Sequence, residues 1–116
     1  MANAYVNGFY TPTQANTPET VFTCPNETTT IFQTLQLVNV SGSKNVSVFI
    51  LDFSTGALNR IAYVEFGGPL ITNVFKGSIV MEEKDVLKIE TSNTSGITGT
   101  TAALETTRIY IPQGAS

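Results

Sequence analysis

The densest cluster of side chains able to do chemistry is the acidic run Glu82-Glu83-Lys84-Asp85. Clustered carboxylates could bind Ca²⁺, which takes oxygen ligands. The surrounding residues do not form an EF-hand loop, and the cationic Lys84 stands inside the run. We therefore interpret the run as a solvated turn between two strands, and we expect neither a metal site nor a cofactor.

Paired carboxylates could also hydrolyse glycosides, for example Asp52 together with Glu65 or Glu90. Nine carboxylates spread over a β-sheet protein would offer such pairs by chance, however, and sequence spacing gives no distance. The chain contains no His, which removes the usual base of a Ser or Cys triad and any His-Glu-x-x-His metal site. We expect a protein that is not an enzyme and has no catalytic residues.

The single cysteine, Cys24, excludes an internal disulfide and fits a chain made in a reducing cytosol. A reactive thiolate would need an activating base, and no His is present to serve. Cys24 is therefore expected to be a small apolar residue at the end of a strand.

The composition excludes further classes of function. Only 13% of the 116 residues are charged, against roughly a quarter in an average domain, whereas Ser, Thr and Asn supply 35 residues. The net charge is −3 and the six Lys and Arg are scattered, so we expect no nucleic-acid partner. The longest apolar run, Val48 to Leu51, is far too short to span a bilayer, so we expect no membrane partner either.

Turn residues recur about every ten positions and separate short apolar segments, which is typical of an antiparallel sandwich. Strands are predicted at residues 21–23, 30–40, 45–53, 59–66, 70–75, 78–81, 86–91 and, in two parts, 101–105 and 107–111. The polar stretch 92–101 is expected to be an exposed loop. The predicted fold is all-β: a single antiparallel, jelly-roll-like β-sandwich of seven or eight strands over residues 21–116, with an extended N-terminal arm over residues 1–20.

The strand at 30–40 carries apolar residues on both faces. Ile31, Leu35 and Leu37 share one face by simple alternation, and Phe32, Val38 and Val40 share the other. This pattern indicates either a central strand or a bulge that shifts the alternation midway.

The N-terminal arm contains four large apolar residues, Tyr5, Val6, Phe9 and Tyr10, which a solvated tail would rarely carry. Two explanations remain open. The arm lies on its own domain as an edge strand, which is the default, or it docks on a neighbouring subunit. These four residues are the candidate partner-binding residues.

Several stretches resemble the small β-sandwich virion structural proteins of tailed bacteriophages. The stretch TTTIFQTLQLVNVSGSKNVSVFILD looks like their first hairpin, and GPLITNVFKGSIVMEEKDVLKIETSN resembles a strand, a Gly, a short apolar piece, an acidic turn with Asp85 and an alternating strand. The closing AALE and the opening YVNGFYTPTQANTPETVFTCP are similar as well. The sequence departs from that pattern at Glu82-Glu83-Lys84, where a Gly is expected before Asp85.

This resemblance implies a non-enzymatic part of a virion, assembled in the host cytoplasm. The favoured role is a capsid decoration or cement protein that binds the major capsid protein as a homo-oligomer, with a trimer expected. A tail, baseplate, neck or fibre-adaptor subunit, which would bind tail proteins, is the alternative. A more distant one is a carbohydrate-binding module that uses the loop at 92–101.

Overall fold

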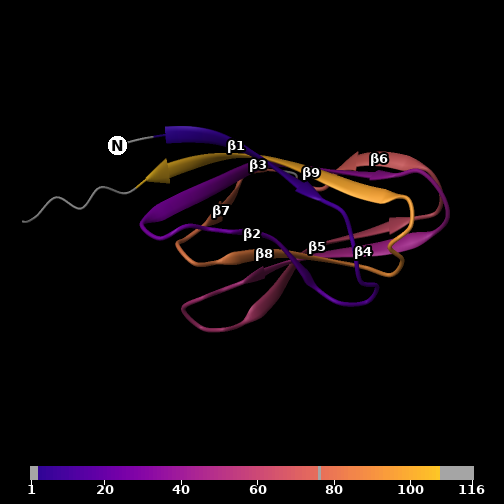
Figure 1. The fold of residues 1–116 in the computed structure, drawn as a ribbon, viewed down its shortest axis with the longest axis horizontal. Helices are drawn as coiled ribbons and strands as arrows, with labels where there is room; N and C mark the ends of the chain where they lie inside the picture. Colours follow the sequence, from indigo (N-terminus) through magenta and orange to yellow (C-terminus); the bar gives the residue numbers. More distant parts are fainter. Residues whose placement is uncertain (1–2, 76, 108–116) are drawn as a thin grey trace, which may run out of the picture.

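The computed structural model describes residues 3–75 and 77–107, which form nine strands and no helix (Figure 1). β-Branched and aromatic residues make up most of the apolar positions, and they favour pleated strands. The all-β prediction is confirmed. The structure has one strand more than the seven or eight predicted, and this additional strand is β1 (Asn3–Tyr10), within the expected N-terminal arm.

The nine strands form two antiparallel sheets packed face to face (Figure 1). The first sheet has the order β1, β9 (Ile97–Thr107), β3 (Thr28–Asn39), β6 (Leu70–Asn73), and β7 (Ile79–Met81) pairs with the other half of β3. The second has the order β2 (Glu19–Thr23), β8 (Val86–Thr91), β4 (Lys44–Leu51), β5 (Leu58–Phe66). The chain crosses from one sheet to the other at every connection except those from β4 to β5 and from β6 to β7. These connections, together with the two strand orders, are those of a jelly roll.

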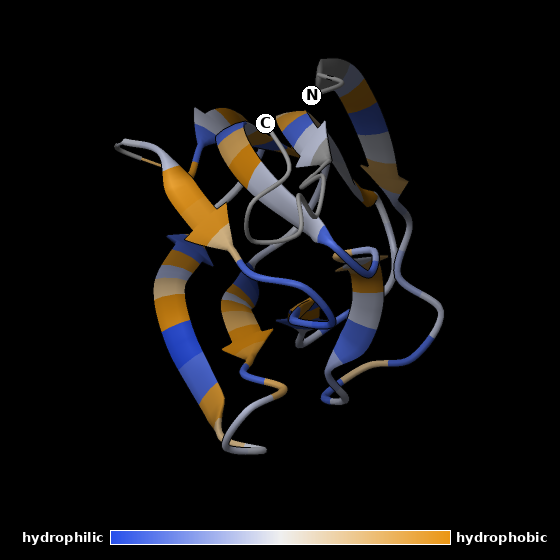
Figure 2. Cartoon of the chain, turned by 90° about the vertical axis from the view of Figure 1, so that its left-hand side faces the viewer, coloured by the Kyte–Doolittle hydropathy of each residue, from blue (hydrophilic) through white to orange (hydrophobic). Residues whose placement is uncertain are grey.

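The core lies between the two sheets and follows from the alternation of apolar and polar residues along the strands (Figure 2). Phe32 is central, since its ring meets Phe22 edge-on at 5.2 Å and Phe75 at 6.2 Å between ring centroids. The other buried apolar side chains are Tyr10, Cys24, Leu35, Leu37, Val46, Val48, Phe66, Met81, Leu87, Ile89, Ile97 and Ala103.

Strand β3 is both central and bulged. It pairs with β9 along its whole length, and the register shifts between Phe32 and Thr34. Because of this extra residue, Phe32 shares the buried side with Leu35 and Leu37, whereas Ile31 faces outward. The grouping of Ile31 with Leu35 and Leu37 by simple alternation is therefore wrong, while the prediction of a bulge is confirmed.

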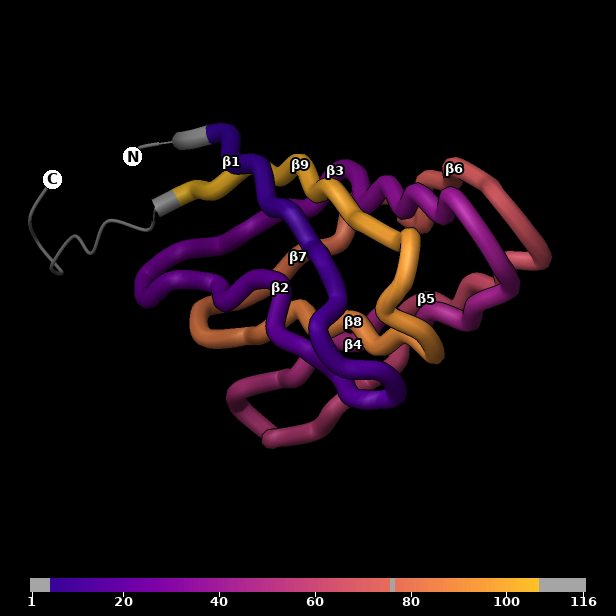
Figure 3. The backbone as a smooth tube through the Cα atoms, turned by 45° about the vertical axis from the view of Figure 1, so that its right-hand side comes forward, coloured from indigo at the N-terminus to yellow at the C-terminus, as the bar shows by residue number. Residues whose placement is uncertain are grey.

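The described part of the N-terminal segment is built into the sandwich. Strand β1 pairs with β9 from Asn3 opposite Thr106 to Tyr10 opposite Gly99 (Figure 3). Gly8 permits this close approach, because a Cβ atom at that position would lie 2.6 Å from the Oγ1 atom of Thr101. The alternative of an edge strand on its own domain is the one observed for these residues.

The polar stretch after β8 is a shorter loop than expected, covering residues 92–96. Ile97, Gly99 and Thr101 already belong to β9 and are buried, since this strand lies between β1 and β3. The expectation of an exposed loop up to residue 101 is therefore wrong. The part of the last predicted strand at residues 108–111 lies outside the described residues.

Candidate interaction surface

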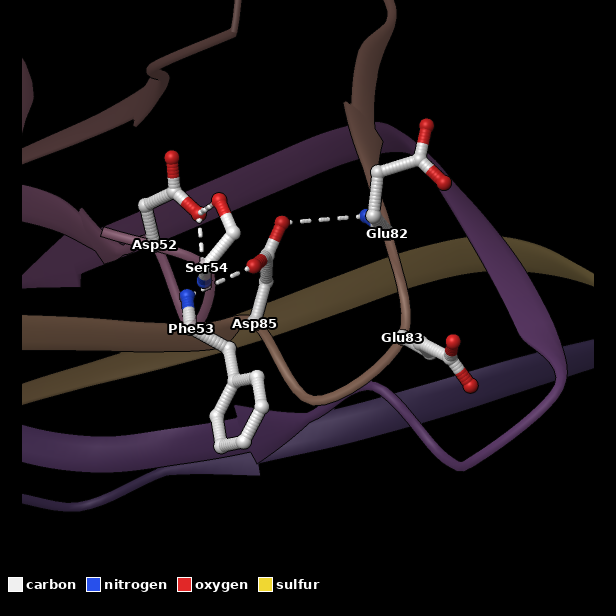
Figure 4. A pocket seen from close by; sticks show the side chains of 6 residues that line it. All are labelled: Asp52, Phe53, Ser54, Glu82, Glu83 and Asp85. Carbon is white, nitrogen blue, oxygen red and sulfur yellow. Dashed lines mark hydrogen bonds between the residues drawn. The ribbon is translucent and has the colours of Figure 1, made fainter. Parts of the chain in front are cut away.

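The acidic run forms a turn that holds two loops together (Figure 4). Asp85 accepts hydrogen bonds from the backbone nitrogens of Phe53 (3.0 Å) and Glu82 (3.1 Å), so it links the turn after β7 to the loop after β4. The turn and the loop line a small pocket between them. On the loop side of this pocket, Asp52 accepts hydrogen bonds from the backbone nitrogen and the hydroxyl of Ser54. These bonds hold the pKa of Asp52 below its ordinary value.

The pocket does not resemble a cation site. In Figure 4 the carboxylates of Glu82 and Glu83 point away from Asp85, and that of Glu83 reaches the backbone nitrogen of Glu27 at 2.8 Å. Within residues 3–75 and 77–107, no three His, Cys, Asp or Glu side chains are placed to hold a metal ion. The geometry therefore agrees with a turn stabilised by backbone hydrogen bonds.

The carboxylate pairs considered for glycoside hydrolysis, Asp52 with Glu65 or with Glu90, lie too far apart in the structure. Glu65 lies beside Asn45 and Glu90 beside Ser47, near one end of the second sheet. Asp52 follows the far end of β4, five or more residues along the strand, which corresponds to roughly 16 Å or more. A carboxylate pair of either inverting or retaining type needs a much shorter separation.

Cys24 lies directly after β2 and is 1% exposed, as expected for a small apolar residue at a strand end. Its Sγ atom contacts the carbonyl oxygen of Thr28 at 3.2 Å and the hydroxyl of Thr30 at 3.3 Å. Burial raises the pKa of the thiol. The side chain is thus a buried thiol that stabilises the fold.

The four candidate partner-binding residues divide into two pairs. Tyr5 and Phe9 point outward from the first sheet and are 81% and 77% exposed. Val6 points inward, packed against the core, and Tyr10 is part of the core at 4% exposed. Only Tyr5 and Phe9 are therefore placed to contact another molecule.

A row of apolar side chains crosses the outer face of the first sheet. Tyr5 on β1 lies opposite Leu104 on β9, Leu104 lies opposite Ile31 on β3, and Ile31 lies opposite Val80 on β7. Directly opposed residues of antiparallel strands share a face, so the four side chains form one line across four strands. We call Tyr5, Ile31, Val80 and Leu104 the apolar row.

On the outer face that carries this row, none of the outward residues within the five described strands is charged. Its remaining outward side chains are uncharged and are contributed by Asn7, Phe9, Thr29, Gln33, Thr34, Gln36, Val38, Ile71, Asn73, Thr98, Thr100, Ala102 and Thr106. Charge depletion distinguishes the centre of a protein interface from the rest of a surface. The outer face of the first sheet therefore has the composition of an interface.

The outer face of the second sheet differs, because it carries charges that already have partners. The Arg60 guanidinium lies 5.7 Å from the ring centroid of Phe49 and 5.5 Å from that of Tyr63. Lys88 donates to the hydroxyl of Thr20 at 3.2 Å. These contacts are typical of a solvated, charged face.

The shortened loop at 92–96 bonds mainly to itself and to neighbouring backbone. Asn93 accepts from the nitrogen of Ser95 at 2.9 Å, and Ser92 accepts from the nitrogen of Asn45 at 3.0 Å. The loop contains no aromatic side chain on which a sugar ring could stack. It therefore lacks the features expected of a carbohydrate site.

Comparison with known proteins adds no family to this description. No protein-family model matches the chain, and no curated protein matches it in sequence. Among the described residues, no helix is long and apolar enough to cross a membrane.

Three members of the apolar row, Ile31, Val80 and Leu104, were not recognised from the sequence. Alternation alone would have placed Leu104 on one face with the uncharged Ala102 and Thr106. Their meeting with Tyr5 depends on the register of strands that lie far apart in the chain.

Proposed function

We propose that the chain is a non-enzymatic structural protein of a bacteriophage virion, with the role of a decoration or cement protein on the capsid. The observation that carries the proposal is the uncharged outer face of the first sheet with its apolar row, which offers a partner a large surface without desolvation of charge. The sequence resemblance supplies the virion setting. Jelly rolls occur in viral capsid and in lectin domains, so the fold is compatible with this role and does not by itself assign it.

Copy number in purified particles of the phage that encodes the chain tests the proposal. On the order of hundreds of copies would support a capsid protein, because closed symmetric shells repeat their contacts many times. About a dozen copies or fewer would support the tail, baseplate, neck or fibre alternative instead. Absence from the particle would overturn both.

The contact surface is tested with particles that lack the chain and are then incubated with purified protein. Val80→Lys places a charge at the 55% exposed end of the apolar row and should strongly reduce binding. Ile61→Lys makes the same change on β5 in the second sheet and should bind like the unmodified chain. Equal binding of both variants to the particles would contradict the assignment of this face. A glycan array tests the carbohydrate alternative separately, and specific binding of the chain to a glycan would favour it.

A further inference from the structure

We infer that two copies of this chain associate through strand β1, which pairs antiparallel with β1 of the second copy and joins the two first sheets into one. The inference concerns self-association alone and does not depend on the virion role. It rests on the edge positions of the sandwich and on the residue pattern of β1.

Strand β1 is the one long edge of the described sandwich that has no protection against pairing. It is hydrogen-bonded to β9 on one side, and the order of the sheet ends there. Its eight residues, NAYVNGFY, contain no charge and no proline. An uncharged, apolar edge of this length exposes a row of backbone donors and acceptors that can pair with another strand.

The other edges are protected. β6 and β7 are four and three residues long. β2 has five residues with Glu19 among them, and its pairing with β8 is irregular between Thr20 and Phe22. β5 is longer, but it carries Arg60 and Glu65, and its pairing with β4 is bulged. Charges, short length and bulges are the devices that prevent edge-to-edge association.

The second copy is the favoured occupant because the outward residues of β1 are arranged symmetrically. Tyr5 and Phe9 lie on either side of Asn7, and these three side chains point to the same outer face. A two-fold axis at Asn7 places Asn7 opposite itself and Tyr5 of each copy opposite Phe9 of the other. Two aromatic cross-strand pairs then cover side chains that are 81% and 77% exposed in one copy.

Charge does not oppose this contact. Although the chain has a net charge of −3, the described outward side chains of β1 and of the neighbouring strands β9 and β3 are all neutral. An isologous contact brings the same patch of both copies together, so any charge on it would face its own like charge. Because the patch is neutral, no like charges face each other in the dimer. The outer faces of the two first sheets then form one continuous surface across the two-fold axis.

The first test is the mass of the full chain in solution, measured by sedimentation over a wide concentration range. A dimer is expected. Asn7→Lys should leave a folded monomer, because it places two ammonium groups opposite each other at the axis. Gln36→Lys makes the same kind of change on the exposed side of β3, two strands from the edge, and should remain dimeric. Circular dichroism checks that both variants are folded.

The second test fixes the register with Asn7→Cys. Directly opposed residues of antiparallel strands have Cα atoms about 4.5 or 5.5 Å apart, within the range that a disulfide requires. Mild oxidation should cross-link this variant quantitatively, and Thr98→Cys, beyond the end of β1 on the same face, should stay uncross-linked. Cys24 does not compete, because it is buried.

A monomer at all concentrations, a trimer, an Asn7→Lys variant that still dimerises, or an Asn7→Cys variant that does not cross-link would each overturn the inference. The trimer expected from sequence is thus distinguished from the two-fold dimer by mass alone. None of these outcomes depends on whether the chain is found in virions, so failure of the proposed function would be recognised separately.

Discussion

The ammonium group of Lys44 donates a 2.8 Å hydrogen bond to the Oδ1 atom of Asn39, and both side chains are buried. Asn39 in turn donates through Nδ2 to the carbonyl oxygens of Gly42 (2.8 Å) and Gly68 (2.9 Å). Lys44 also donates to the carbonyl oxygen of Ser41. The pair therefore connects the turn between β3 and β4 with the turn between β5 and β6, at one end of the sandwich.

Replacement of Asn39 should be strongly destabilising. Asn39→Ala removes an acceptor from a buried ammonium group and the donor from two carbonyls, so we expect a loss of about 3 kcal/mol in the free energy of unfolding. Lys44→Met removes the charge together with its need for an acceptor and should cost about 1 kcal/mol. Guanidinium titrations measure both values, and a larger loss for Lys44→Met than for Asn39→Ala would contradict this account.

Lys84 adopts a left-handed backbone conformation, with φ at 68°, directly before Asp85. The resemblance to virion structural proteins leads us to expect a Gly before Asp85, and Lys84 stands there instead. The Lys84 ammonium group lies 4.8 Å from the ring centroid of Phe53, a contact that Lys84→Ala would lose. Lys84→Gly loses the same contact but relieves the backbone, so it should be about 1 kcal/mol more stable than Lys84→Ala in thermal or denaturant unfolding. Equal stability of the two variants would show that the turn is not strained.

Tyr10 has a buried hydroxyl with no hydrogen-bond partner within the described residues. Burial, together with the nearby charges of Glu19 and Glu90, raises the pKa of this phenol. Tyr10→Phe removes the unsatisfied group and keeps the ring, so the free energy of unfolding should rise by about 1 kcal/mol. Tyr10→Leu should lower it, because the ring is lost from the core. A destabilised Tyr10→Phe variant would mean that the hydroxyl makes a stabilising contact.

Glu19 should make stability sensitive to acid. Its carboxylate accepts hydrogen bonds from the hydroxyl and the backbone nitrogen of Thr13 and from the backbone nitrogen of Gln14. These bonds, above all those from Thr13, hold the pKa of Glu19 below the ordinary 4.5. Since the folded state has the lower pKa, the unfolded state binds the proton first as pH falls. The stabilising contribution of the Glu19 carboxylate to the free energy of unfolding is therefore present above pH 4.5, and it is lost as pH falls through the folded-state pKa.

Unfolding titrations at several pH values test this expectation. Glu19→Gln should be less stable than the unmodified chain at neutral pH, and the two should converge at low pH. Thr13→Val, which removes the hydroxyl donor, should show a similar but smaller convergence. Parallel pH profiles for the unmodified chain and Glu19→Gln would rule out this role for the carboxylate.

Local patterns in the sequence predicted some parts of the fold well. Strand β8 has the bounds expected for it, Val86–Thr91, because its residues alternate cleanly between two flanking turns. The start of β9 could not be predicted in the same way. Residues 97–101 have the composition of a loop, and they become a strand because β1 and β3 supply pairing partners on both sides.

The candidate surface was predictable only in part. Aromatic residues in a polar segment drew attention to Tyr5 and Phe9, but their separation from Val6 and Tyr10 needed the pairing of β1 with β9. The position of Ile31 depends on the bulge after Phe32, which changes the face of every residue on one side of it. Such registers are set by contacts between distant strands, and no short-range pattern encodes them.

The pairing of Asn3 with Thr106 joins the first described strand to the last one. During synthesis, β1 and β3 are made long before β9, the strand that lies between them. The first sheet therefore closes only after β9 itself has left the ribosome. Loop closure over most of the described residues must precede these contacts, so folding should be slow for a domain of this size.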